Sequence, residues 1–220
     1  KSIYILLLII ISSIVSAQET EKIYSIIEGI SPLRIEKDIK KLVSFGTRHT
    51  LSDTLSESRG IGAARRWIKS EFDAISKNCN QCLDVFYQKN YFTPKDGDRI
   101  IKPVWINNVV AIQKGTKHPN RYIIMSGDID SRISDPNNFT EDSPGANDNA
   151  SGMAGTIEAA RVLSKYSFEN SIIYLGLAGE EQGLFGGKGF AKHAKDMGWE
   201  LIGILNNDMI GNIKGVDGVI

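Results

Sequence analysis

Acidic side chains follow several apolar runs of the sequence, at places where strands of a sheet would end. The acids that follow such runs are Asp128, Asp130, Glu180, Glu181 and Asp208. A further one, Asp148, lies in a loop rich in Gly and Asn, directly before a helical pattern. Ligands of open α/β sheets bind outside the carboxyl ends of the strands. We therefore expect acids from four separate segments to meet in one crevice.

Several carboxylates in one crevice repel each other unless cations neutralise them. Two divalent ions bridged by one carboxylate would bind a water molecule, lower its pKa and polarise a substrate carbonyl. A further carboxylate outside the metal shell could then accept the water proton. The adjacent pair Glu180 and Glu181 suits this division of labour, because neighbouring residues at a strand end point in different directions.

Each acid, taken singly, could also be an ordinary surface side chain that is solvated by water. The loop Gly145–Gly152 could likewise be an ordinary turn in which Asn149 or Ser151 caps the following helix. The placement of all these acids after successive apolar runs favours the metal centre.

Two helices and a set of strands are expected to position these acids. Ile35, Ile39 and Leu42 recur at helical spacing after Ser31-Pro32, and a longer apolar stripe runs from Ile61 to Ile75. The strands are predicted at 85–91, 104–113, 122–125, 172–177 and 201–206, and two more helices at 151–164 and 187–197. This rhythm predicts an α/β fold, a three-layer sandwich with a mostly parallel mixed sheet flanked by helices.

Composition excludes one class of partner. The 220 residues carry 26 Lys and Arg against 26 Asp and Glu, so no excess positive field is available to hold nucleic acid. No repeat, low-complexity segment or linker divides the chain, which predicts one α/β domain. The oligomeric state leaves no trace in the sequence.

The first residues resemble a secretory signal peptide. An apolar run from Ile3 to Ile11 is followed by small residues up to Ala17, after which cleavage is expected. A membrane span needs about 20 apolar residues, so stable membrane insertion is not expected. We predict a signal peptide at residues 1–17, a domain at 18–220, and an exported protein, periplasmic or secreted.

The two cysteines, Cys79 and Cys82, form a single C-x-x-C pair. In an oxidising compartment a local disulfide is favoured over free thiols, and both are favoured over a metal role, because no second pair of cysteines completes a zinc site.

Three long motifs resemble the M28 family of zinc aminopeptidases and carboxypeptidases. They are Pro144–Gly152 with Glu158–Arg161, Ala178–Gly186, and Asn207–Gly211, in the order found in the family. The similarity extends from about Pro32 to the end of the chain, and Phe45–His49 supports it. Three such motifs in order are far more specific than one short metal-binding pattern.

The resemblance implies roles for the acids and two zinc ions as cofactors. Asp148 would bridge the ions, while Glu181 and Asp208 would each bind one of them. Glu180 would be the general base. The family places a histidine ligand where this chain has Asp128, which predicts Asp128 as a ligand or a weakened, one-metal centre. Asp130 then loses its usual purpose of orienting that histidine.

The family's last histidine ligand lies beyond Ile220, and His49, His118 and His193 are each expected to be ordinary surface histidines. We therefore predict that this stretch of chain alone binds at most one metal tightly and is catalytically weak. The complete protein is expected to hydrolyse terminal peptide bonds of peptide substrates, as a probable aminopeptidase-type exopeptidase. The alternatives are a peptidase-like binding domain without catalysis and an acyltransferase of the related glutaminyl-cyclase fold.

Overall fold

The computed structural model describes residues 20–214. The chain divides between Ser31 and Pro32 into two compact units. In the first unit, residues 20–28 are helical. The predicted signal peptide at 1–17 lies outside the described residues, so it stays a prediction. Within the described residues, no helix is long and apolar enough to cross a membrane.

The second unit contains the helices and strands that the sequence predicts, with small shifts at their ends. The helices are α2 (Pro32–Val43), α3 (Gly60–Asn78), α4 (Gly152–Leu163) and α5 (Phe185–Asp196), with a short irregular helix η1 (Ala146–Ser151) before α4. The strands are β1 (Leu83–Phe92), β2 (Val104–Gln113), β3 (His118–Asp128), β4 (Asn170–Leu177) and β5 (Glu200–Asn207).

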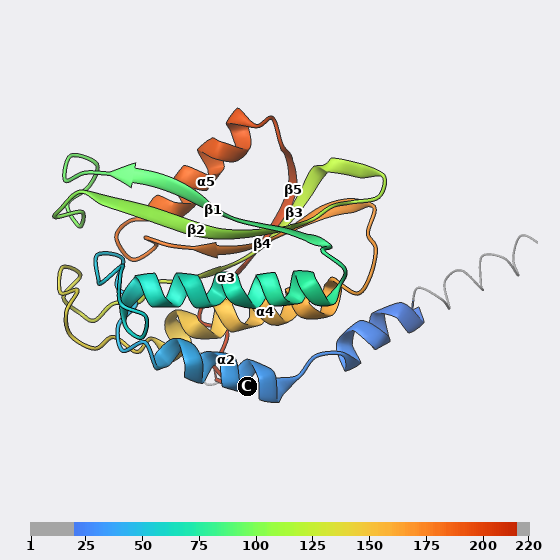
Figure 1. The fold of residues 1–220 in the computed structure, drawn as a ribbon, viewed down its shortest axis with the longest axis horizontal. Helices are drawn as coiled ribbons and strands as arrows, with labels where there is room; N and C mark the ends of the chain where they lie inside the picture. Colours follow the sequence, from blue (N-terminus) through green and yellow to red (C-terminus); the bar gives the residue numbers. More distant parts are fainter. Residues whose placement is uncertain (1–19, 215–220) are drawn as a thin grey trace, which may run out of the picture. The chain divides into compact units, whose positions relative to one another are not determined.

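The strands form one mixed sheet in the order β1-β2-β4-β3-β5 (Figure 1). β3 is parallel to both β4 and β5, whereas β1 pairs with β2, and β2 with β4, in antiparallel fashion. The mixed sheet is confirmed. Its parallel half holds the three strands whose carboxyl ends carry the predicted site, so these ends lie along one edge.

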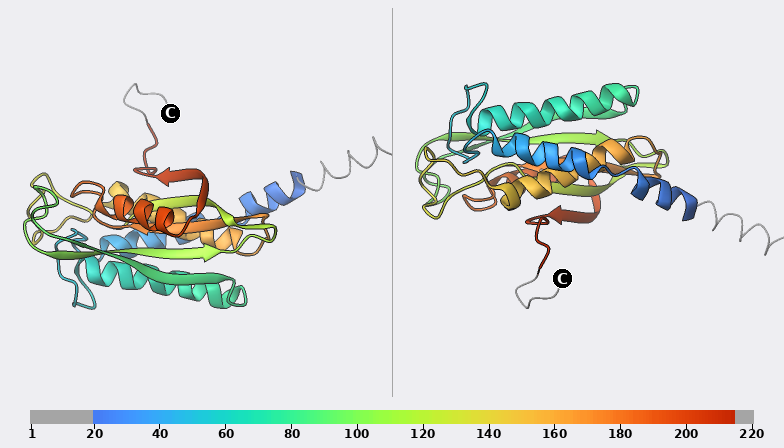
Figure 2. Two further views of the ribbon diagram at one scale, coloured as in Figure 1. Left: turned by 90° about the horizontal axis from the view of Figure 1, so that it is seen from above. Right: turned by 90° about the horizontal axis from the view of Figure 1, so that it is seen from below.

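Helices cover both faces of this sheet, which confirms the layered α/β fold (Figures 1 and 2). α3 and α4 pack on one face, where Phe72, Val109 and Ile157 belong to one apolar core. α5 packs on the other face, where Phe190 joins Val110 in a second core. Neighbouring residues of β2 thus enter opposite cores, which explains why its apolar residues do not alternate with polar ones.

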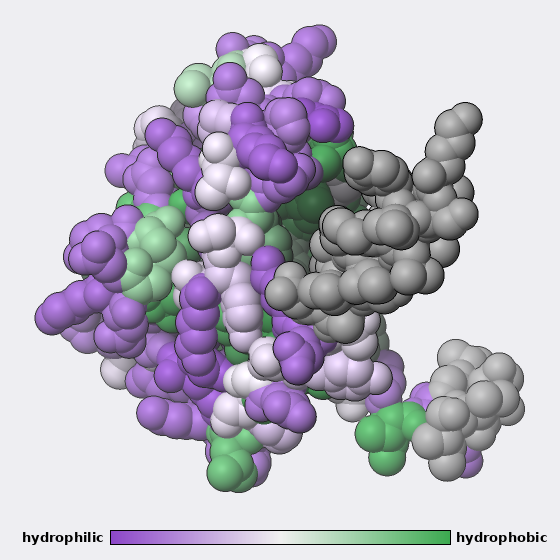
Figure 3. Space-filling model, turned by 90° about the vertical axis from the view of Figure 1, so that its right-hand side faces the viewer, coloured by the Kyte–Doolittle hydropathy of each residue, from purple (hydrophilic) through white to green (hydrophobic). Residues whose placement is uncertain are grey.

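Among the described strands, β5 lies at the edge of the sheet and pairs with β3 alone (Figure 2). Its apolar side chains are exposed on both faces, with Ile202 at 40%, Ile204 at 60% and Leu205 at 58%. An exposed edge with apolar side chains is a surface on which further chain can pack. By contrast, the end of the molecule at which the parallel strands begin is mostly hydrophilic, with smaller apolar patches (Figure 3).

Cys79 and Cys82 form a disulfide directly after α3. The favoured prediction is therefore confirmed, and the pair is excluded as a metal site.

A buried carboxylate on α2 lies near charged side chains of α3 and α4. Asp38 on α2 is 3% exposed and lies near Arg34, Glu71 and Glu158. Burial raises the pKa of Asp38 to about 6, and the neighbouring acids add to the effect while Arg34 opposes it. Ionised Asp38 therefore opposes folding.

We expect the Asp38→Asn variant to become more stable than the wild type as the pH rises. The folded protein keeps the Asp38 proton up to about pH 6, while the unfolded chain loses it near 3.8. The wild type thus loses stability between these pH values, and the difference should reach about 2–3 kcal/mol above pH 6. Urea unfolding from pH 4 to 8 measures it, with Asp73→Asn on exposed α3 surface as the control. A constant difference between Asp38→Asn and the wild type would contradict the expectation.

Candidate active site

The carboxyl ends of β3, β4 and β5 bring the predicted acids together. β3 ends at Asp128, opposite Leu177 of β4, and Gly127 pairs with Asn207 of β5. The pKa of Glu180 is raised to about 7, first by burial and then by Asp130, Glu181, Asp208 and Asp148. Because charges act in this way only over short distances, the acids form one electrostatic cluster. The acids thus lie at one edge of the sheet, and their roles as ligands and base stay predictions.

Asp128 is a buried member of this cluster, with 4% of its surface exposed. Its Oδ2 accepts a hydrogen bond from Nδ2 of Asn149 at 2.9 Å. The pKa of Asp128 is raised to about 8, mainly by burial and then by Asp130. The side chain thus points into the cluster, where an added positive charge would restore its ionised form.

Asn149 joins the three parts of the site. Besides Asp128, its Nδ2 reaches the backbone oxygen of Asn207 at 2.8 Å. Its Oδ1 accepts the amide of Gly152 at 3.0 Å, which caps the start of α4. The structural role that the sequence allowed for Asn149 is therefore present, together with its contact to the acids.

Asp148 is presented by a tight turn before α4. Gly145 adopts a left-handed conformation with φ of 48°. A Cβ at Gly145 would lie 2.3 Å from the backbone oxygen of Asp148 and 2.6 Å from Cβ of Ser131, so only glycine fits. The peptide bond between Asp148 and Asn149 is cis. Asp148 is solvent-exposed at the mouth of the cluster, as is Asp208 after β5.

The two adjacent glutamates have different surroundings, as predicted. The carboxylate of Glu181 forms an ion pair with Nε of Arg132 at 2.6 Å. No described residue donates a hydrogen bond to the half-buried carboxylate of Glu180. Glu180 is therefore the acid suited to exchange a proton near neutral pH, whereas burial raises the pKa of Glu181 and the ion pair with Arg132 opposes that effect.

Asp130 has a purpose that the sequence did not indicate. We expected it to lose its function because residue 128 is not a histidine. Asp130 is 1% exposed and accepts a hydrogen bond from the hydroxyl of Thr50 at 2.7 Å. It also accepts the backbone amides of Glu180 and Glu181, each at 3.2 Å. Asp130 therefore holds the turn that carries both glutamates.

The segment Thr47–Thr50 is a buried support that sequence reasoning did not assign to the site. Arg48 is 1% exposed, and its guanidinium donates to the backbone oxygens of Leu42, Ile129, Pro144 and Gly145, at 2.7–3.2 Å. It thus ties the loop after β3 to the loop that carries Asp148. The sequence offered one signal, the similarity of Phe45–His49 to the family's N-terminal region.

His49 was predicted as a surface histidine, and this prediction was wrong. His49 is 0% exposed, and its Nε2 lies 2.9 Å from the oxygen of Pro136 and 3.0 Å from Nε2 of Gln182. Burial lowers the pKa of His49. The side chain is buried because it bridges the loop after β3 and the glutamate turn. His118 is exposed as expected, while His193 is half-buried against Phe190 and Trp199.

The donor set fits a divalent cation in its chemistry. The pKa values of Asp128, Glu180 and Asp208 are each raised, first by burial and then by neighbouring acids, and the guanidinium of Arg132 pairs with Glu181. In the part of the chain that the structure describes, no three His, Cys, Asp or Glu side chains lie close enough to hold a metal. A metal held by these acids would thus require their side chains to lie closer together than they do here.

The sheet with helices on both faces, and acids at the ends of its parallel strands, defines a fold shared with aminopeptidases. The structure of LapA aminopeptidase from Legionella pneumophila is 21% identical with a TM-score of 0.66, over 85% of this chain and 45% of that one. A glutaminyl cyclase from Porphyromonas gingivalis is 18% identical with a TM-score of 0.65, over 84% of this chain and 62% of that one. Likeness at this level shows the fold alone.

The sequence gives the family. The profile of peptidase family M28 matches residues 108–217. A probable zinc metalloprotease of Pyrenophora tritici-repentis is 41% identical over 198 residues, which are 90% of this chain and 46% of that protein. One of Pyrenophora teres f. teres is 42% identical over 198 residues, 90% of this chain and 43% of that protein. The chain belongs to peptidase family M28, and it spans less than half the length of these relatives.

Proposed function

We propose that the complete protein is a zinc-dependent exopeptidase of the aminopeptidase type, which hydrolyses terminal peptide bonds. One observation carries the proposal: Glu180 is half-buried beside four other acids, has no cation partner among the described residues, and has a pKa of about 7. A carboxylate with such a pKa suits a general base at neutral pH. The zinc metalloproteases of the family support the choice of metal.

Each acid has a proposed role in this reaction. Asp148, Glu181 and Asp208 are the proposed zinc ligands, with Asp128 in the position that a family histidine takes. Zinc, when bound, supplies a Lewis acid that polarises the substrate carbonyl and acidifies water. Glu180 accepts the proton of the attacking water and passes it to the leaving amine. Asp130 and Thr50 fix the backbone of the glutamate turn and so hold Glu180 in place.

Export is proposed as well. The signal-peptide pattern at residues 1–17 supports it, and so does the disulfide between Cys79 and Cys82, since disulfides persist in oxidising compartments.

A glutaminyl-cyclase activity is the second candidate, because glutaminyl cyclases share the fold and Asp128 alters the two-zinc pattern. We expect the full-length protein to release free amino acids from short peptides, and a zinc chelator to abolish this release. Mass spectrometry of peptides with amino-terminal glutamine separates the two reactions. Cyclisation of the glutamine without release of an amino acid would overturn the proposed peptidase.

A further inference from the structure

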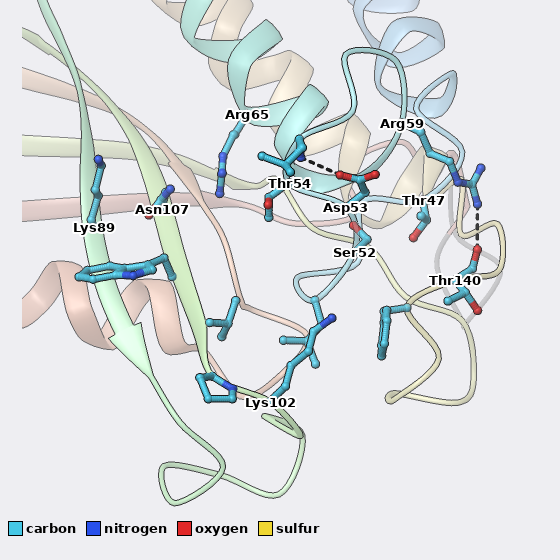
Figure 4. A pocket seen from close by; sticks show the side chains of 16 residues that line it. Thr47, Ser52, Asp53, Thr54, Arg59, Arg65, Lys89, Lys102, Asn107 and Thr140 are labelled. Atoms are coloured by element: carbon cyan, nitrogen blue, oxygen red, sulfur yellow. Dashed lines mark hydrogen bonds between the residues drawn. The ribbon is translucent and has the colours of Figure 1, made fainter.

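A large cavity lies beside the acid cluster. Its volume is about 990 Å³, at the upper end of the range for ligand pockets. Figure 4 shows its lining: Arg65 on α3, Lys89 and Asn107 on the β1–β2 pair, Lys102 on the loop before β2, and Arg59 near Thr140. None of these residues belongs to the proposed catalytic centre.

The lining is cationic. The cavity wall carries one carboxylate, that of Asp53, and four cationic side chains: Arg59, Arg65, Lys89 and Lys102. The Asp53 carboxylate accepts hydrogen bonds from the backbone amides of Leu55 and Ser56, at 2.7 Å and 3.0 Å. Its hydrogen bonds therefore lie within its own turn. Arg59 is paired with Asp142 at 2.6 Å. Within residues 20–214, this leaves Arg65, Lys89 and Lys102 without an ion-pair partner, and both lysines are exposed.

Arg65 is the most informative of the three. Within residues 20–214, no hydrogen bond or ion pair involves its guanidinium. Burial lowers the pKa of Arg65, which reflects the cost of this position. A partly buried arginine without an anion is costly to keep, and an anionic ligand would remove the cost. Lys102 lies over the ring of Phe139 at 3.9 Å, which keeps its charge at the cavity wall.

Asn107 adds a requirement of a different kind. Its side chain lines the cavity and is 9% exposed, and its Oδ1 is buried without a hydrogen-bond partner among residues 20–214. An unpaired buried acceptor calls for a hydrogen-bond donor. Inorganic phosphate offers negative charge and an O–H donor but no apolar group. A peptide with acidic side chains offers negative charge, N–H donors and apolar groups, for which Trp105 and Phe139 provide an apolar wall.

Two loops connect the cavity to the glutamate turn. The loop between β1 and β2 contributes Lys102 to the cavity, and its Arg99 donates to the backbone oxygen of Glu181 at 2.7 Å. The loop after β3 contributes Phe139, and its Arg132 pairs with the carboxylate of Glu181. Both loops therefore contact Glu181 and also line the cavity.

We propose that this cavity binds an acidic segment of a peptide substrate, through Arg65, Lys89 and Lys102 for its carboxylates and Asn107 for a backbone or side-chain N–H. This inference rests on the proposed peptidase function and names the preferred substrate class. The site adds affinity for acidic peptides without taking part in the hydrolysis itself.

Binding is tested separately from turnover, on the full-length protein in a chelator so that no hydrolysis takes place. A short fluorescent peptide rich in Glu is compared by anisotropy with its counterpart that carries Gln instead. We expect the Glu peptide to bind at least about tenfold more tightly, with an affinity that falls as salt is added. Equal binding of the two peptides overturns the proposal and leaves the proposed hydrolysis untouched.

Variants locate the binding. Lys89→Gln with Lys102→Gln removes two exposed cations, and Arg65→Gln and Asn107→Ala test the partly buried groups. Each should weaken binding of the Glu peptide, and the double variant by about tenfold or more. Lys77→Gln, at the far end of α3 from Arg65, is the matched control and should bind normally. Unchanged binding by the double lysine variant, or displacement of the peptide by equimolar phosphate, overturns the proposal.

Discussion

Exchange of Glu180 for Gln should abolish nearly all peptide hydrolysis by the full-length protein. Glutamine keeps the shape of the side chain but cannot accept the proton of the attacking water, and a positioned general base contributes about 10²–10⁴-fold to a rate. The effect should fall on kcat, because Glu180 is not a proposed metal ligand and its carboxylate forms no hydrogen bond with any described residue. Steady-state kinetics on a short peptide measures the loss.

Zinc binding distinguishes loss of the base from loss of the metal. Zinc should raise the melting temperature of Glu180→Gln as much as that of the wild type, because the ligands remain. Glu141→Gln, the same exchange on an exposed loop, is the matched control and should leave kcat unchanged. A Glu180→Gln enzyme that hydrolyses peptides at the normal rate would remove Glu180 from the reaction.

Exchange of Arg48 for Met should destabilise the protein more than any surface substitution. The guanidinium is buried and donates to four backbone oxygens, which methionine would leave without donors. It is also a buried positive charge near Asp130 and Asp148, both of which raise the pKa of Arg48 against the effect of burial. Removal of one member of such a buried network costs about 3–5 kcal/mol.

The free energy of unfolding in urea measures this cost. Arg121→Met is the matched control, because Arg121 is 41% exposed and pairs with exposed Glu200. That variant should lose no more than about 1 kcal/mol. Because Arg48 ties together the loops after β3 and before α4, its loss should also weaken zinc binding. An Arg48→Met protein as stable as Arg121→Met would show that the segment Thr47–Thr50 is not the support described above.

The sequence predicted the elements well where one physical pattern dominates. The stripe from Ile61 to Ile75 has helical period over many turns, and it forms α3. The run Val104–Gln113 has no polar alternation because both of its faces are buried, and it forms β2 with the predicted ends. The antiparallel addition of β1 and β2 to the parallel strands follows from pairing between distant segments, which periodicity does not encode.

The convergence of the acids was also contained in the sequence. Carboxyl ends of parallel strands share one edge, so the positions of Asp128, Glu180 and Asp208 after their strands were sufficient to predict it. The roles of these residues as metal ligands and base remain predictions. The side chains do not by themselves form a closed metal shell in the described residues. Their final arrangement depends on the balance between mutual repulsion and a bound cation.

Only the tertiary structure decided which polar residues are buried. Nothing local distinguishes Arg48, His49 or Asn107 from surface residues, because their burial depends on partners far away in the chain. Arg48 is buried because carbonyl groups of three separate segments point at it, and His49 because Pro136 and Gln182 reach it. Hydrophobic pattern and strand-end position are local properties that a sequence determines, whereas hydrogen bonding between distant loops exists only once the chain has folded.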